Sequence, residues 1–80
     1  MPQRLKTAKK VVGIKQLRRA LTDGTAEAVF LARDADPALT DPIRDLCDES
    51  SVQWTEVSSM RELGAACGIA VGAAAAAIVR

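Results

Sequence analysis

Histidine and tyrosine are absent from this 80-residue chain, and phenylalanine and tryptophan occur once each. Without histidine the chain excludes Cys–His zinc ligation, Cys–His nucleophiles and Ser–His–Asp catalysis. The shortage of aromatic rings argues against a platform on which single-stranded bases would stack. A Walker-type glycine-rich loop and a dinucleotide-binding fingerprint are also missing. Any enzyme built from this chain would have to rely on carboxylates alone, and we expect no enzymatic activity and no cofactor.

Cysteine and long apolar runs are scarce as well. Cys47 and Cys67 are the only cysteines, and their wide spacing predicts small buried side chains with free thiols, as is usual in a reducing cytoplasm. No apolar run reaches the roughly 20 residues of a membrane span without interruption. The N-terminus is basic but lacks the apolar stretch of a signal peptide. We therefore expect a cytoplasmic protein that does not bind membranes.

Acidic residues are missing from the first 22 positions. That segment holds seven lysines and arginines, whereas residues 23–80 hold four basic and ten acidic side chains. The formal net charge of +1 therefore conceals a segment of +7 followed by one of −6. Such a distribution attracts a polyanion to one face of a protein and repels it from the rest. A solvated basic tail has the same composition, so the pattern inside the segment matters.

The basic segment contains the pattern of an amphipathic helix. Its apolar residues have the i, i+3, i+4 spacing of a buried stripe: Leu17, Ala20 and Leu21. At about 100° per residue, one set of polar side chains falls on the opposite side: Lys15, Arg18, Arg19 and Thr22. Gly13 precedes this helix and Asp23-Gly24 ends it. The positive dipole end of the helix therefore coincides with the start of a basic stripe, which favours a phosphate backbone.

The length of the chain suffices for one small domain, residues 1–80, with one core. Strand-like and amphipathic stretches alternate from Val11 onward, which predicts an α/β sandwich of about four strands. Expected strands cover residues 28–32 and 52–57. One expected helix starts at the Asp-Pro of residues 36–37 or at that of residues 40–42. The next follows Ser58 or Ser59 and ends at Gly68. Its inner side is formed by Met60, Leu63, Ala66 and Cys67.

The alanine-rich end, residues 72–79, is ambiguous. Alanine has the best helix propensity of any residue, so local evidence predicts a helix. A central strand that is covered on both faces by helices can also need small residues throughout.

Asp34 and Asp36, just after the apolar run 28–32, form the best carboxylate pair in the chain. Two aspartates at the carboxyl end of a strand could hold a magnesium ion. Asp36 directly before Pro37 is, however, typical of a turn or a helix N-cap. We favour the turn-and-cap interpretation and keep a magnesium-dependent enzyme as the weaker alternative.

Three stretches of the chain resemble the signature motifs of the L-seven-Ae family of ribosomal proteins, in the family's order and spacing. They are residues 13–19, 31–37 and 63–74, with the sequences GIKQLRR, LARDADP and LGAACGIAVGAA. The third is the most specific, because its Leu-Gly, Cys-Gly and Val-Gly-Ala-Ala stand at fixed offsets. The chain is most similar to the short bacterial members of the family, over nearly all of its length.

This resemblance implies a fold and a ligand. The fold is a three-layer α/β/α sandwich with a mixed four-stranded sheet, in which the alanine run is a central strand. The ligand is kink-turn RNA, a bulge beside tandem sheared G·A pairs that bends a duplex sharply, bound by a monomer associated with the ribosome; ribosomal RNA is one candidate. Family members set the N-terminus of the second helix into the groove at the G·A pairs and pack the loop before the last strand on the bulge bases. The implied RNA-binding residues are Gly13, Ile14, Lys15, Gln16, Arg18, Arg19, Arg33, Ile69, Ala70 and Val71.

The side chains at these positions suit that ligand, with two departures from the family pattern. Lys15 can donate to O6 and N7 of guanine, and Gln16 offers a donor and an acceptor to a purine edge. Many family members have Asn-Glu, and then Lys, where this chain has Lys15-Gln16 and Arg19, so we expect higher affinity and weaker discrimination. Ala70 stands where an acidic residue is frequent. As an alternative, the segment 69–71 is an apolar patch for a protein partner and the basic stripe is incidental.

Overall fold

The computed structural model describes residues 9–80 and contains seven elements in that range. In chain order they are β1 (Lys10–Val12), α2 (Ile14–Asp23), β2 (Ala26–Ala32), α3 (Pro37–Glu49), β3 (Trp54–Val57), α4 (Met60–Cys67) and β4 (Ala75–Val79). Arg4 and Lys6, which belong to the basic segment, lie outside the described residues. Within residues 9–80, no helix combines the length and the apolar character needed to cross a membrane.

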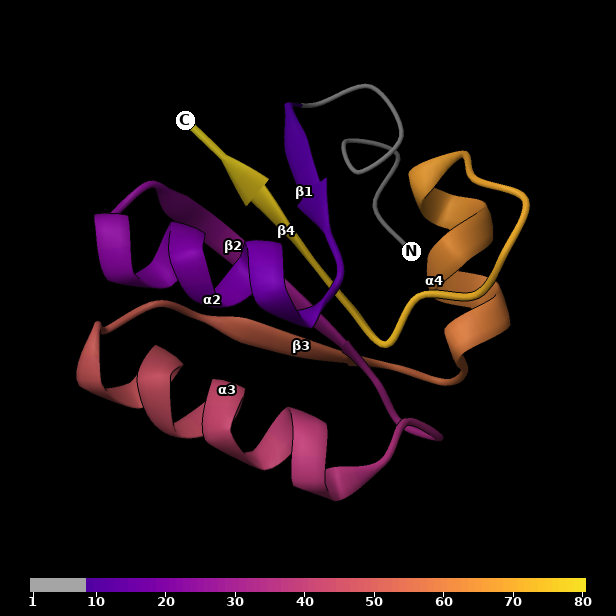
Figure 1. Cartoon of the computed structure of the whole chain (residues 1–80), viewed down its shortest axis with the longest axis horizontal. Helices are drawn as coiled ribbons and strands as arrows, with labels where there is room; N and C mark the ends of the chain where they lie inside the picture. The colour runs from indigo at the N-terminus through magenta and orange to yellow at the C-terminus, as the bar shows by residue number, and fades with distance from the viewer. Residues whose placement is uncertain (1–8) are drawn as a thin grey trace.

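The four strands form one mixed sheet in the order β1-β4-β2-β3. Strand β4 pairs antiparallel with β1 and β2, and β2 pairs parallel with β3. Helices α2 and α3 cover one face of the sheet and α4 covers the other (Figure 1). The predicted three-layer α/β/α sandwich with a mixed four-stranded sheet is therefore confirmed.

The alanine-rich end is the central strand β4, so the helix predicted from local propensity is wrong. Ala75 and Ala77 pack in the apolar cluster under α2 and α3, whereas Ala76 packs in the cluster under α4. All three side chains are fully buried. Hydrogen bonds to a strand on each side and burial on both faces outweigh a helix propensity that amounts to less than about 1 kcal/mol per residue.

Most predicted helix ends agree with the structure. Gly24 and Gly68 end α2 and α4 in the left-handed conformation. Ser59 caps α4, since its Oγ accepts the Glu62 N–H at 3.0 Å. Asp36 caps α3, since its carboxylate accepts the Ala38 N–H at 2.9 Å.

Two local expectations fail. The second helix-start signal, residues 40–42, lies inside α3 because Asp36-Pro37 has already provided a cap and a proline at the first helical position. Thr40 is buried within that helix.

The second expectation concerns the inner side of α4. Leu63 and Cys67 are buried as predicted, but Met60 is exposed. Met60 begins α4 at the end of the sheet, where the helix contacts the following loop instead of the core: the Ala73 N–H donates to its carbonyl at 2.9 Å.

Both cysteines are buried free thiols, as predicted. Cys47 lies in the cluster under α2 and α3, and Cys67 in the cluster under α4, so the sheet separates them. Burial, assisted by the negative charge of Asp48, raises the pKa of Cys47 to about 11. Burial also raises the pKa of Cys67, although Lys10 partly opposes that shift.

These thiols should react slowly with a thiol-specific dye in the native protein and quickly after denaturation. The pKa of Cys47 is higher in the folded protein than its ordinary value of 9.0, so the folded state holds the thiol proton more tightly than the unfolded state. The resulting contribution to stability is fully present below pH 9.0 and is lost as the pH rises toward about 11. Unfolding by denaturant between pH 8 and 11 measures this loss, which the Cys47→Ala variant should reduce. Fast labelling of the native protein, or unfolding on addition of reductant, would contradict the assignment.

Candidate functional site

Helix α2 begins without a side-chain cap, unlike α3 and α4. Its N-cap residue is Gly13, with φ 104° and ψ 154° and no side-chain hydrogen bond to the helix. A side chain would be strained at this φ, and a Cβ atom there would stand 3.2 Å from Oε1 of Gln16. The first-turn N–H groups, on Ile14, Lys15 and Gln16, are thus left to solvent or to a ligand, at the positive end of the helix dipole.

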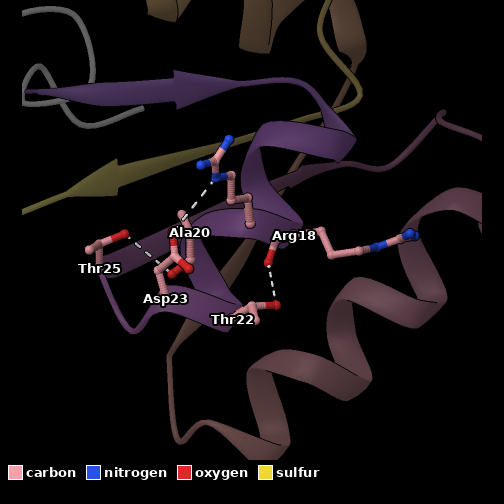
Figure 2. Close-up of polar contacts among 6 residues, drawn as sticks. Arg18, Ala20, Thr22, Asp23 and Thr25 are labelled. Atoms are coloured by element: carbon pink, nitrogen blue, oxygen red, sulfur yellow. Dashed lines mark hydrogen bonds and ion pairs between the residues drawn. The ribbon is translucent and has the colours of Figure 1, made fainter.

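The basic stripe of α2 faces solvent, as its periodicity predicts. Lys15, Arg18 and Arg19 are exposed on the side opposite the buried Leu17 and Leu21. Figure 2 shows the Arg18 side chain extending from α2 on the side of α3. The Thr22 hydroxyl donates to the backbone carbonyl of Arg18 at 3.0 Å.

Arg19 has an acidic neighbour one turn further along α2. Its Nε lies 3.8 Å from Oδ2 of Asp23, and the two side chains are 86% and 56% exposed. An ion pair this long and this exposed is screened by water and contributes little. Arg19 therefore remains available to a phosphate or a base.

The loop between α4 and β4 presents apolar side chains to solvent. Val71 is 70% exposed and Ile69 is 37% exposed, with Ala70 exposed between them. The loop lies against α4 (Figure 1). The Ile69 N–H donates to the Gly64 carbonyl at 3.1 Å, and a Cβ on Gly64 would stand only 2.1 Å from the Val71 carbonyl oxygen. The backbone of the loop thus occupies the space that a side chain at Gly64 would need.

These segments meet at one end of the sheet, where the loop enters β4. The Gly13 N–H donates to the Ala75 carbonyl at 2.9 Å, which joins the start of α2 to the start of β4. The Ala32 N–H donates to the Ala74 carbonyl at 2.9 Å, which brings the end of β2 and the exposed Arg33 to the same place. These hydrogen bonds place residues 13–16 and Arg33 beside the start of β4, where the loop ends. Residues 69–71 lie earlier in the same loop, against α4, and Arg18 and Arg19 lie further along α2.

Asp34 and Asp36 are engaged as helix caps. Asp34 Oδ1 accepts the N–H of Met60, the first residue of α4, at 2.7 Å, and Asp36 accepts from Ala38 in α3. Among residues 9–80 there is no group of three or more Cys, Asp or Glu side chains placed to hold a metal ion. The turn-and-cap interpretation therefore accounts for both carboxylates.

Sequence reasoning missed the role of Arg44. Its Nη1 lies 3.5 Å from Asp41, its Nη2 lies 3.5 Å from Glu56, and its guanidinium carbon lies 4.9 Å from the centre of the Trp54 ring. Only the Asp41 contact, three residues away, is visible in sequence. Arg44 ties α3 to β3 and so belongs to the scaffold, not to the basic stripe.

An open groove lies where α3 ends and β3 begins, at the other end of the sheet from Arg33. It is lined by Cys47, Asp48, Ser51, Val52, Gln53, Trp54 and Thr55. The only charged side chain in this lining is acidic, so the groove does not suit a polyanion.

A family model matches the entire chain. The model is described as the Ribosomal protein L7Ae/L30e/S12e/Gadd45 family, and it covers residues 1–80. The chain belongs to this family. The resemblance of the chain to this family is therefore confirmed. In the structure, residues 13, 32, 74 and 75, which belong to or adjoin the three stretches 13–19, 31–37 and 63–74, are joined by hydrogen bonds at the start of β4.

Individual relatives of this L7Ae-family chain are named as RNA-binding proteins. The chain is 50% identical over 76 residues to an RNA-binding protein of Geobacillus sp. (strain WCH70), covering 95% of this chain and 93% of that protein. It is 46% identical over 76 residues to an RNA-binding protein of Geobacillus thermodenitrificans (strain NG80-2), with the same coverage. Among solved structures, the Giardia lamblia 15.5kD RNA binding protein superposes with a TM-score of 0.89 at 26% identity, over 98% of this chain and 69% of that one.

The close approach of the Val71 carbonyl to Gly64 can be tested by whether a Gly64→Ala substitution raises or lowers the free energy of unfolding. Replacing a glycine by alanine within a helix normally stabilises the helix by about 1 kcal/mol. Here the new Cβ would collide with the Val71 carbonyl, so Gly64→Ala should lower the free energy of unfolding, by about 1–3 kcal/mol. Chemical denaturation of the variant and the parent measures the difference. A stabilised Gly64→Ala protein would show that the loop does not pack on α4 as described.

Proposed function

We propose that this L7Ae-family chain binds RNA and recognises kink-turns, as a monomer associated with the ribosome. The observation that carries the proposal is the juxtaposition of an uncapped, basic helix N-terminus and an exposed apolar loop at one end of the sheet. A kink-turn presents the two matching features side by side, namely an opened groove between phosphate backbones and extruded bulge bases. The names of the bacterial relatives and of the Giardia protein support RNA as the ligand.

The start of α2 provides the polar half of the proposed site. The major groove of regular A-form RNA is too deep and narrow for side chains, so a helix end enters only where non-canonical pairs open it. Lys15 is exposed and can donate to O6 and N7 of guanine, and Gln16 can both donate to and accept from a purine edge. The unpaired N–H groups of the first turn suit a backbone phosphate.

Arginines extend this polar half along two elements. Arg18 and Arg19 continue the basic stripe of α2, and Arg33 stands at the end of β2. Guanidinium groups form paired, charge-assisted hydrogen bonds with phosphate oxygens. We assign these three side chains to the backbone on either side of the bend, where they set position and affinity without reading the sequence.

The loop provides the apolar half. Ile69 and Val71 offer aliphatic surface to bulge bases. Ala70, between them, has a small and uncharged side chain. The two aromatic residues are elsewhere, since Phe30 is buried in β2 and Trp54 is held under Arg44 on β3. The bases therefore pack on aliphatic side chains in this proposal and do not stack between rings.

A protein-interaction module is the second candidate, favoured by the 70% exposure of Val71. An apolar contact with a protein would depend little on salt, whereas neutralisation of phosphates releases counterions. Salt dependence therefore separates the two functions.

Affinity for a kink-turn RNA should fall steeply as salt rises. If the basic face neutralises about four to six phosphates, the slope of log K against log salt should be roughly −3 to −5. Titrations at several salt concentrations measure this slope. Equal affinity for a duplex whose G·A pairs are replaced by Watson–Crick pairs, or a flat salt response, would refute kink-turn recognition.

Arg19→Ala should weaken binding of the kink-turn RNA by about 1–3 kcal/mol and reduce the magnitude of the salt slope by about 1. Little stability should be lost, because the Arg19 side chain is exposed and its ion pair with Asp23 is long. Arg80→Ala is the charge-matched control, since Arg80 is exposed and follows the far end of β4. Equal weakening by both substitutions, in affinity measured by titration, would show general electrostatics and no specific contact by Arg19.

A further inference from the structure

Three hydrogen bonds close a ring beside the apolar half of the site. The Ala32 N–H donates to the Ala74 carbonyl at 2.9 Å, and the Ala73 N–H donates to the Met60 carbonyl at 2.9 Å. The Met60 N–H in turn donates to Asp34 Oδ1 at 2.7 Å. The chain itself joins residues 32 to 34 and residues 73 to 74, so the ring is complete. Two of the three bonds join main-chain atoms, and only the third depends on a side chain.

The bond from Met60 to Asp34 spans 26 residues of sequence. Met60 begins α4, and its N–H is one of the first-turn donors that the helix itself cannot pair. A carboxylate at that position receives a charge-assisted hydrogen bond and lies at the positive end of the helix dipole. Ser59 caps the same helix locally, because its Oγ accepts the Glu62 N–H at 3.0 Å. Helix α4 thus has a local cap, which fixes its own first turn, and a distant one, which fixes its place relative to β2.

The loop between α4 and β4 packs on α4, so the two move together. Val71 packs its carbonyl where a Gly64 side chain would stand, and the Ile69 N–H donates to the Gly64 carbonyl. A Cβ on Gly72 would stand 3.2 Å from the Met60 Cβ, so the far end of the loop also rests on the helix. A displacement at the start of α4 therefore moves Ile69 and Val71 relative to the end of β2.

We infer that Asp34 is a positioning residue for RNA recognition, which sets the distance between the apolar loop and the basic residues at the end of β2 and the start of α2. The inference rests on the proposed function and adds a residue that does not itself touch RNA. Its consequence concerns selectivity: without the Asp34 bond, the loop no longer meets the bulge bases while the basic stripe still holds the backbone. Removing a negative charge next to Arg33 would by itself raise affinity for any RNA. A selective loss of kink-turn affinity therefore has the opposite sign from the general electrostatic effect.

The test uses Asp34→Ala, Asp34→Asn and Ser59→Ala in the full chain, with two RNAs. One RNA is a kink-turn, and the other is a continuous duplex of the same length without the bulge. Asp34→Ala should lose about tenfold in affinity for the kink-turn, as expected when the displaced loop loses part of its apolar contact with the bulge bases, and should keep or gain affinity for the duplex. Asp34→Asn keeps an oxygen acceptor and should stay within about threefold of the parent. Ser59→Ala removes the other cap of α4 and should lower thermal stability with the preference for the kink-turn unchanged.

Equal loss of kink-turn preference in Asp34→Ala and Ser59→Ala would overturn the inference, because it would reduce Asp34 to an ordinary helix cap. Unchanged preference in Asp34→Ala would overturn it as well. If Asp34→Ala does not fold, Asp34→Glu replaces it: the charge is kept and the acceptor moves, so selective loss supports the inference and full retention refutes it. A parent protein without any preference for the kink-turn would instead refute the proposed function.

Discussion

The start of the central strand β4 is the point on which the rest of the structure depends. Ala75, Ala76 and Ala77 have no exposed surface, and they let the helices of both outer layers approach one strand closely. The same strand receives β1 on one side and β2 on the other. Because the carbonyls of Ala74 and Ala75 accept the N–H groups of Ala32 and Gly13, the packing of the core also sets the position of each part of the proposed site.

The distribution of charge follows this architecture. The basic residues of α2 are exposed, whereas α3, on the same face of the sheet, presents an acidic outer side: Asp41, Asp45, Asp48 and Glu49. This distribution favours a polyanion at α2 and disfavours one at α3. The two aspartates that follow Arg33, Asp34 and Asp36, each accept a helix N–H, so they stabilise the scaffold next to the proposed site.

The parts of the fold that could be predicted from sequence are those governed by local chemistry. The ends of α2 at Gly13 and Gly24 follow from the conformational freedom of glycine, and the start of α4 follows from the capping oxygen of Ser59. The buried thiols and the exposed face of the basic stripe follow from composition and helical period. The three-layer arrangement and the candidate site came from the resemblance of three motifs to a known family, since spacing alone does not place the start of α2 beside the start of β4, where the loop ends.

Other features depend on contacts between distant residues, which a single sequence does not display. Propensity favours a helix for the alanines of β4, and only the two neighbouring strands make them a strand. The Asp-Pro signal at residues 41–42 has no effect once Asp36-Pro37 has started α3. Arg44 meets Trp54 and Glu56 only because α3 packs beside β3, and Asp34 meets Met60 only because the end of β2 lies beside the start of α4.

The most direct test of the proposed site is to follow the backbone amide signals of isotope-labelled protein by NMR while a kink-turn RNA is added. Binding at this site should give the largest shifts at residues 13–19, at Arg33 and at residues 69–72, with signals from the outer side of α3 and from the groove at residues 51–55 unchanged. Shifts centred on that groove or on α3, with the start of α2 unaffected, would contradict the assignment of the site.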